Sequence, residues 1–139
     1  MSADDGLITI ASRHSVKDTI DRLEASLKAK GITVFARIDH AAGAKSVDMP
    51  LRPTEVLIFG NPKAGTPLMQ ASQTIGLDLP LKALAWQDAA GKVWLTTTDM
   101  AWLGRRHRLG VEAAGAVSAL ASVLANLAAG ATQSLDKCR

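Results

Sequence analysis

The sequence predicts an α+β two-layer sandwich, in which one sheet of about five strands has helices packed on one face. Apolar residues recur at every second position in some segments and every three or four positions in others, as in strands and amphipathic helices. The expected order is β-α-β-β-α-β-β-α, and such grouped strands with interposed helices are typical of this class. The chain of 139 residues is long enough for one domain with a hydrophobic core.

The N-terminal third predicts a strand followed by a well-delimited helix. Residues 6–11 alternate in the manner of a short strand. Ser15, with Asp18 three positions later, has the pattern of a helix N-cap. The apolar stripe of this helix is spaced four, three and four residues apart: Val16, Ile20, Leu23 and Leu27. Gly31 is suited to the residue just beyond the helix end.

The next segment predicts two strands separated by a long polar loop. Residues 32–39 alternate apolar and polar side chains, which indicates a strand with one apolar face. Residues 40–49 are small and polar and can hold a short helical turn, and Pro50 and Pro53 then favour extended backbone. The third strand covers about 55–59.

A tight loop after the third strand is the stretch around which we expect the chain to be organised. Val56 to Phe59 are apolar without alternation, which suits a strand covered on both faces. The run from Gly60 to Pro62 ends this strand. We expect the second helix to begin with Thr66 as its N-cap and Pro67 in its first position, and to reach about residue 75.

The C-terminal half predicts a hairpin and two helices. Strands at 81–87 and 93–98 flank a turn at 88–91 that ends in glycine. Trp86 and Trp94 lie on either side of this turn, where they can pair across the hairpin. Asp99 is placed to cap a short helix, and an Ala-rich helix follows at about 111–131. This helix has the length of a membrane span, but its Ala and polar content favours a helix that covers the sheet or pairs with a second subunit.

Composition excludes several classes of function. The chain is 47% hydrophobic and 21% charged, with a net charge of only +3, so no nucleic-acid partner and no membrane partner is expected. The one cysteine, Cys138, cannot build a disulfide framework. The acidic start leads into no apolar leader segment, and we therefore expect a cytoplasmic protein.

Four blocks of this sequence resemble the DUF302 family, small bacterial and archaeal domains of unknown function. They are residues 36–42, 52–69, 79–84 and 91–95, and the Phe59-Gly60-Asn61-Pro62 run is the most specific part. The similarity spans roughly 6–128, so the whole chain, 1–139, is read as a single domain of this kind. The resemblance implies an α+β fold and a dimer. It supplies no activity and no catalytic residues.

The loop from Gly60 to Thr66 is the main candidate for a ligand site. Glycines such as Gly65 let a ligand approach the backbone, amides at a helix start favour an anion, and Lys63 adds positive charge. It is no Walker loop, since the Gly-Lys-Ser/Thr ending is missing. The structural alternative is that Asn61 and Thr66 only shape a turn and cap a helix.

A second candidate is a polar catalytic site around His40, Thr54 and Asn61. Histidine can act as a general base or a metal ligand, although adjacent strand residues point to opposite faces, so Asp39 cannot easily orient His40. No metal-binding spacing is present, and no metal or cofactor is expected.

Three functional hypotheses follow. The first is a non-catalytic domain that binds or senses a small anionic or apolar ligand at the Gly60–Thr66 loop and acts as a homodimer. The second is an enzyme that uses the His40, Thr54 and Asn61 group. The third is a structural interaction domain that uses the C-terminal helix.

Overall fold

The computed structural model describes residues 5–133 and confirms the α+β class. Residues 1–4 and Cys138 lie outside the described part. Five strands form one antiparallel sheet in the spatial order β1-β5-β4-β3-β2. Their bounds are β1 Leu7–Ser12, β2 Thr33–Asp39, β3 Thr54–Gly60, β4 Leu81–Gln87 and β5 Val93–Thr98. The first two strands of the chain therefore form the two opposite edges of the sheet.

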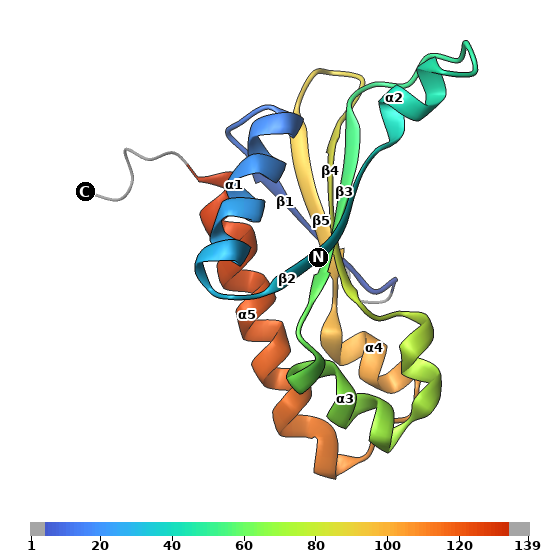
Figure 1. Ribbon diagram of the computed structural model, residues 1–139, viewed down its shortest axis with the longest axis vertical. Helices are drawn as coiled ribbons and strands as arrows, with labels where there is room; N and C mark the ends of the chain where they lie inside the picture. Colours follow the sequence, from blue (N-terminus) through green and yellow to red (C-terminus); the bar gives the residue numbers. More distant parts are fainter. Residues whose placement is uncertain (1–4, 134–139) are drawn as a thin grey trace.

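The helices occupy three places around this sheet (Figure 1). Their bounds are α1 Val16–Ala29, α2 His40–Lys45, α3 Pro62–Ala71, α4 Met100–Arg106 and α5 Ala114–Thr132, with two short 3₁₀ helices, η1 Gln73–Leu77 and η2 Val111–Ala113. The long helices α1 and α5 lie side by side on one face. α3, η1 and α4 gather beyond the end of the sheet where β3 finishes, whereas α2 projects at the opposite end.

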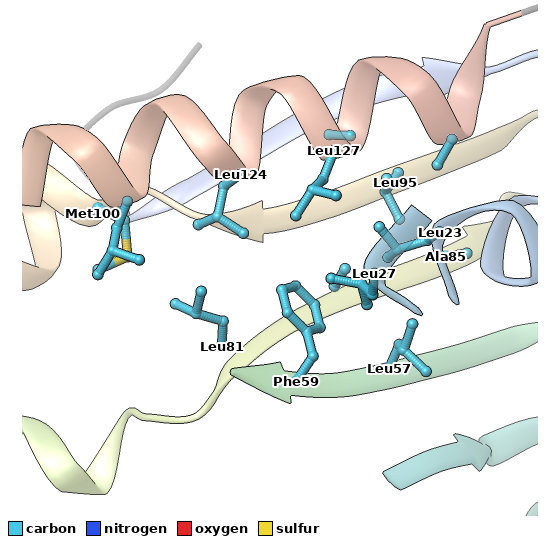
Figure 2. Packing of buried hydrophobic residues seen from close by; sticks show 14 of the residues in the cluster. Leu23, Leu27, Leu57, Phe59, Leu81, Ala85, Leu95, Met100, Leu124 and Leu127 are labelled. Atoms are coloured by element: carbon cyan, nitrogen blue, oxygen red, sulfur yellow. The ribbon is translucent and has the colours of Figure 1, made fainter. Parts of the chain in front are cut away.

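The hydrophobic core fills the space between the sheet and the two long helices (Figure 2). Leu57 and Phe59 of β3 and Leu95 of β5 point from the sheet toward Leu27 of α1 and Leu127 of α5. These five side chains are at most 3% exposed. The apolar residues predicted to form one stripe of the first helix, spaced four, three and four positions apart, form the buried side of α1. Burying a side chain of this size contributes about 1.5–3 kcal/mol.

Several predicted boundaries are confirmed by backbone detail. The Asp18 amide donates to Ser15 Oγ at 3.0 Å, and Asp99 caps α4 through the amides of Ala101 and Trp102. Gly31 and Gly91 both have positive φ, as their places after a helix and in a hairpin turn require. A bulge at Phe35 in β2, between Val34 and Ala36, was not foreseen.

The second helix begins earlier than predicted. Asn61, not Thr66, is its N-cap, and Pro62 takes the first helical position, so Pro67 falls inside α3. The sequence holds two cap-and-proline pairs five residues apart, and both satisfy the same rule. The earlier pair is used because Asn61 follows the last residue of β3 directly.

The segment Val111–Thr132 is, within residues 5–133, the one helical stretch with the length and hydropathy of a membrane span. Length and composition alone are weak evidence for such a role. One side of the helix, which includes Leu120, Leu124 and Leu127, is buried against α1, α4 and the sheet. The Ala-rich helix therefore covers the sheet, as one of the two sequence-based alternatives expected.

The second face of the sheet has no helix over it in the described part of the chain. The alternation of the registers places Ile38, Ile58, Leu84, Trp86 and Trp94 on this face. Ile38 is 42% exposed, and the others are partly exposed. We call this surface the open sheet face.

Candidate functional site

A pocket of about 360 Å³ lies where β3 passes into α3. Its floor is apolar and includes the buried side chains of Phe59, Leu81 and Leu127. Its outer wall includes Phe35 of the β2 bulge and Val123 of α5, which are 53% and 38% exposed. The volume lies in the range of small-molecule sites, which are mostly apolar with a few polar groups.

Three of the six predicted site residues line this pocket: Asn61, Gly65 and Thr66. They lie at the start of α3, and Asn61 and Thr66 are exposed at the rim. Gly65 lies close to the wall, because a Cβ added there would stand 3.6 Å from Leu79 and 3.8 Å from Met69. The predicted loop is therefore part of a cavity, although apolar side chains form most of that cavity.

The backbone amides at this helix start are already engaged. Asn61 Oδ1 accepts the Lys63 amide at 2.9 Å, and the Asn61 carbonyl oxygen accepts the amides of Ala64 and Gly65 at 2.9 and 3.0 Å. The nitrogen of Pro62 has no proton to donate. An anion would therefore have to displace intramolecular bonds, which argues against binding at the backbone of this loop.

The remaining predicted residues are placed elsewhere. Lys63 is exposed and stands between two lining residues without lining the pocket itself. Thr54 begins β3, about 20 Å of strand away from Gly60 at its end, and its hydroxyl donates to the Arg52 carbonyl oxygen at 2.9 Å. His40 opens α2 at the same distant end and is exposed. The structure therefore does not bring His40 and Thr54 together with Asn61.

A second polar cluster was not apparent in the sequence. His107 is the C-cap residue that follows α4, and it is 8% exposed. Its Nε2 lies 2.5 Å from Asp78 Oδ2, and its Nδ1 lies 2.9 Å from Thr74 Oγ1. Arg106 also contacts Asp78, at 3.3 Å. The cluster fixes η1 to the end of α4, and none of these residues lines the pocket. His107 lies about 30 positions after Thr74 and Asp78 in the chain, so no local sequence pattern indicates that they meet.

A charged network around Arg37 joins α1 to the sheet, and its residues do not line the pocket. Arg37 of β2 contacts Asp21 and Glu24 of α1 and Glu55 of β3 at 2.7–3.0 Å. Partial burial alone would lower the pKa of Arg37, but its hydrogen bonds to these carboxylates raise it above its usual value.

Within residues 5–133, no three His, Cys, Asp or Glu side chains are grouped so that they could hold a metal ion.

The fold and the pocket define a small α+β sandwich domain with an apolar cavity at one end of its sheet. Residues 8–127 match the family described as "Domain of unknown function DUF302". The chain belongs to the DUF302 family, and the resemblance seen in the sequence is confirmed.

Known proteins similar to this chain fall into two groups. The fluoride-specific ion channel FluC 1 of Brucella suis is 56% identical over 117 residues, which are 84% of this chain and 46% of that protein. FluC 2 of Brucella melitensis has the same identity over the same length, 43% of that protein. The chain thus spans less than half the length of these curated relatives.

The second group is structural. The crystal structure of an uncharacterized conserved DUF302 protein from Bacillus stearothermophilus superposes with a TM-score of 0.72, over 96% of this chain and 98% of that one. The two sequences are 21% identical, so this likeness shows the fold alone.

Proposed function

We propose that the domain binds a small, largely apolar ligand in the pocket beside Asn61, without catalysing a reaction. The observation that carries this proposal is the pocket itself, a cavity of about 360 Å³ with an apolar floor and an exposed rim. The scattered positions of His40 and Thr54 favour binding over catalysis, since the polar groups that a reaction would need do not converge there.

An uncharged fluorescent probe, N-phenyl-1-naphthylamine, tests this proposal. We expect its emission to rise on binding to the protein. Val123→Trp should weaken binding at least tenfold, because the larger side chain enters the cavity from an exposed position on α5. Val111→Trp is the matched control, since Val111 is 91% exposed and does not line the pocket. Equal binding by all three proteins would contradict the proposal.

We propose further that the domain is a homodimer joined through the open sheet face. Five strands spaced about 4.8 Å apart, each about 20 Å long, give a face with a projected area of roughly 500 Å². The accessible surface of its side chains is larger than this projection and approaches the roughly 800 Å² per partner of a standard interface. Among the strand residues that the structure describes, Lys82 is the one charged residue that the registers place on this face, and its Nζ turns away to the end of the sheet, where it donates to the Pro80 carbonyl oxygen. Two copies can therefore meet there with few charges to desolvate.

A second candidate function is supported by the Brucella relatives. We propose that the domain regulates a fluoride-specific channel, either as part of the same chain or as a partner protein. The 56% identity over 84% of this chain favours this idea. The compartment would be the cytoplasm, as the sequence led us to expect.

Fluoride efflux from liposomes tests this candidate with the Brucella suis relative, whole or without the segment that matches this chain. We expect the shortened protein to conduct fluoride but to lose any response to an apolar ligand that the whole protein shows. Identical efflux from both proteins, with and without such a ligand, would contradict a regulatory role.

A further inference from the structure

We propose that the ligand of this pocket is an amphiphile with a single aliphatic chain and a carboxylate head group, such as a medium-chain fatty acid. This inference rests on the proposed binding function and names its ligand class. The chain of the ligand would fill the apolar cavity, and the carboxylate would stay at the rim.

The charges next to the pocket favour a negative head group. Lys63 lies between two pocket residues on α3, and Lys82 Nζ donates to the carbonyl oxygen of the pocket residue Pro80. Lys30 lies two residues before Ile32, which also lines the pocket. Within residues 5–133, none of these three lysines forms an ion pair with a carboxylate. The neighbouring acid, Asp78, is occupied by His107 and Arg106.

The position of Lys82 is the most specific of these. Its Nζ turns back toward the end of the sheet, where it donates to the Pro80 carbonyl oxygen at 3.2 Å and reaches the Asp78 carbonyl oxygen at 3.5 Å. Pro80 lines the pocket. These partners are carbonyl oxygens and not carboxylates, so the ammonium group can still pair with an incoming anion.

The Asn61 side chain, one of two polar side chains at the rim, has matching chemistry. Asn61 Oδ1 is used by the Lys63 amide, so the part of this side chain left for a ligand is its NH₂ group, which donates hydrogen bonds. The backbone amides of Ala64 and Gly65 already donate to the Asn61 carbonyl oxygen. Side chains that donate, together with nearby cations, recognise an acceptor that carries negative charge, which an alcohol or amine head group lacks.

The size of the cavity limits the length of the chain. An apolar cavity of about 150 Å³ holds one benzene molecule. On that scale the pocket, at about 360 Å³, has room for about 14 non-hydrogen atoms. An unbranched chain of about ten carbons with its head group at the surface fits this space, whereas a two-chain phospholipid does not.

Calorimetric titration with decanoate, decanol and decyltrimethylammonium tests the inference. We expect decanoate to bind at least tenfold more tightly than decanol, and the cationic amphiphile to bind least. The double variant Lys63→Gln, Lys82→Gln should bring decanoate to the affinity of decanol without changing decanol binding. Lys45→Gln is the matched control, because Lys45 lies on α2 at the other end of the sheet. Added salt should weaken decanoate binding alone.

The outcomes separate the two levels of proposal. Equal binding of decanoate and decanol, both abolished by Val123→Trp, would overturn the carboxylate head group and keep the apolar site. Absence of binding by every amphiphile and by the uncharged probe would overturn the ligand-binding function itself. Binding to phosphatidylglycerol vesicles without uptake of free decanoate would show that the cations meet a membrane surface, which would also overturn this inference.

Discussion

Trp86 on β4 and Trp94 on β5 stand directly opposite each other across the antiparallel ladder, with ring centroids 6.3 Å apart and planes inclined by 28°. Each indole N–H is bonded at 2.9 Å, Trp86 to Thr96 Oγ1 and Trp94 to Asp88 Oδ2. The pair is therefore fixed on the open sheet face, and its partly exposed rings add apolar area to the surface through which we expect two copies to associate.

Ile38→Glu is expected to convert the proposed dimer into a monomer. Ile38 lies on the open sheet face, where it is 42% exposed, so the change places a charge in the interface without disturbing the core. Mass measurement by light scattering during size exclusion checks this. Val111→Glu, at a site outside the open sheet face, should leave the mass of the assembly unchanged. A monomeric parent protein, or a dimeric Ile38 variant, would contradict the assignment of the interface.

Asn61→Ala is expected to lower the free energy of unfolding by about 1 kcal/mol, the usual cost of a lost N-cap. The bond from the Lys63 amide to Asn61 Oδ1 would disappear. Asn61→Asp keeps the acceptor oxygen and adds negative charge at a helix start, so its stability in urea unfolding should match that of the parent.

The Asn61→Asp variant also loses the NH₂ donor of the side chain and should therefore bind decanoate more weakly than the parent. Full decanoate affinity in Asn61→Asp would contradict a head group at this position.

Acid should loosen the β4–β5 hairpin through Asp88. A hydrogen bond from the Trp94 indole, with further bonds from the amides of Lys92 and Ala90, lowers the pKa of Asp88. Because the folded pKa lies below the unfolded value, this contribution to stability is present above about pH 4 and is lost as the pH falls further. We expect Asp88→Asn to show a smaller loss of melting temperature between pH 5 and pH 2.5 than the parent. Parallel acid profiles would contradict this.

Arg37→Ala is expected to destabilise the domain by about 1–3 kcal/mol, because it leaves a partly buried carboxylate, Glu55, without its partner. The hydrogen bonds from Lys17 and Arg37 lower the pKa of Asp21, so the favourable part of the network is lost as the pH falls below about 4. The deficit of the variant should therefore shrink in acid. Urea unfolding at pH 7 and pH 3 measures it, with Arg13→Ala at an exposed site as control. A deficit independent of pH would argue against an electrostatic origin.

The fold could be predicted from the sequence because its signals are local. Ser15, Gly31 and Asp99 delimit helices through bonds to neighbouring residues. Alternation of apolar and polar residues identifies β1 and β2, and an unbroken apolar run identifies β3. The site was predicted only in part. The Asn61 loop was found because strand, turn and cap are consecutive, whereas the apolar wall depends on Val123, about 60 positions later, and on the unforeseen bulge at Phe35. Such convergence is set by tertiary packing and leaves no periodic signal.

The His107 cluster shows the same limit and gives the last prediction. His107 is buried, and its two ring nitrogens contact Asp78 and Thr74, which lie near each other in the chain but far from His107. Asp78→Ala removes the partner of Nε2 and should cost about 1–3 kcal/mol, because a buried polar atom loses its hydrogen bond. Ser72→Ala is the matched control, since Ser72 Oγ only reaches Thr74 Oγ1 at 3.4 Å. Urea unfolding followed by tryptophan fluorescence separates the two. If both variants are as stable as the parent, the cluster does not hold η1 against α4. The buried His107 would then need a chemical role and not a structural one.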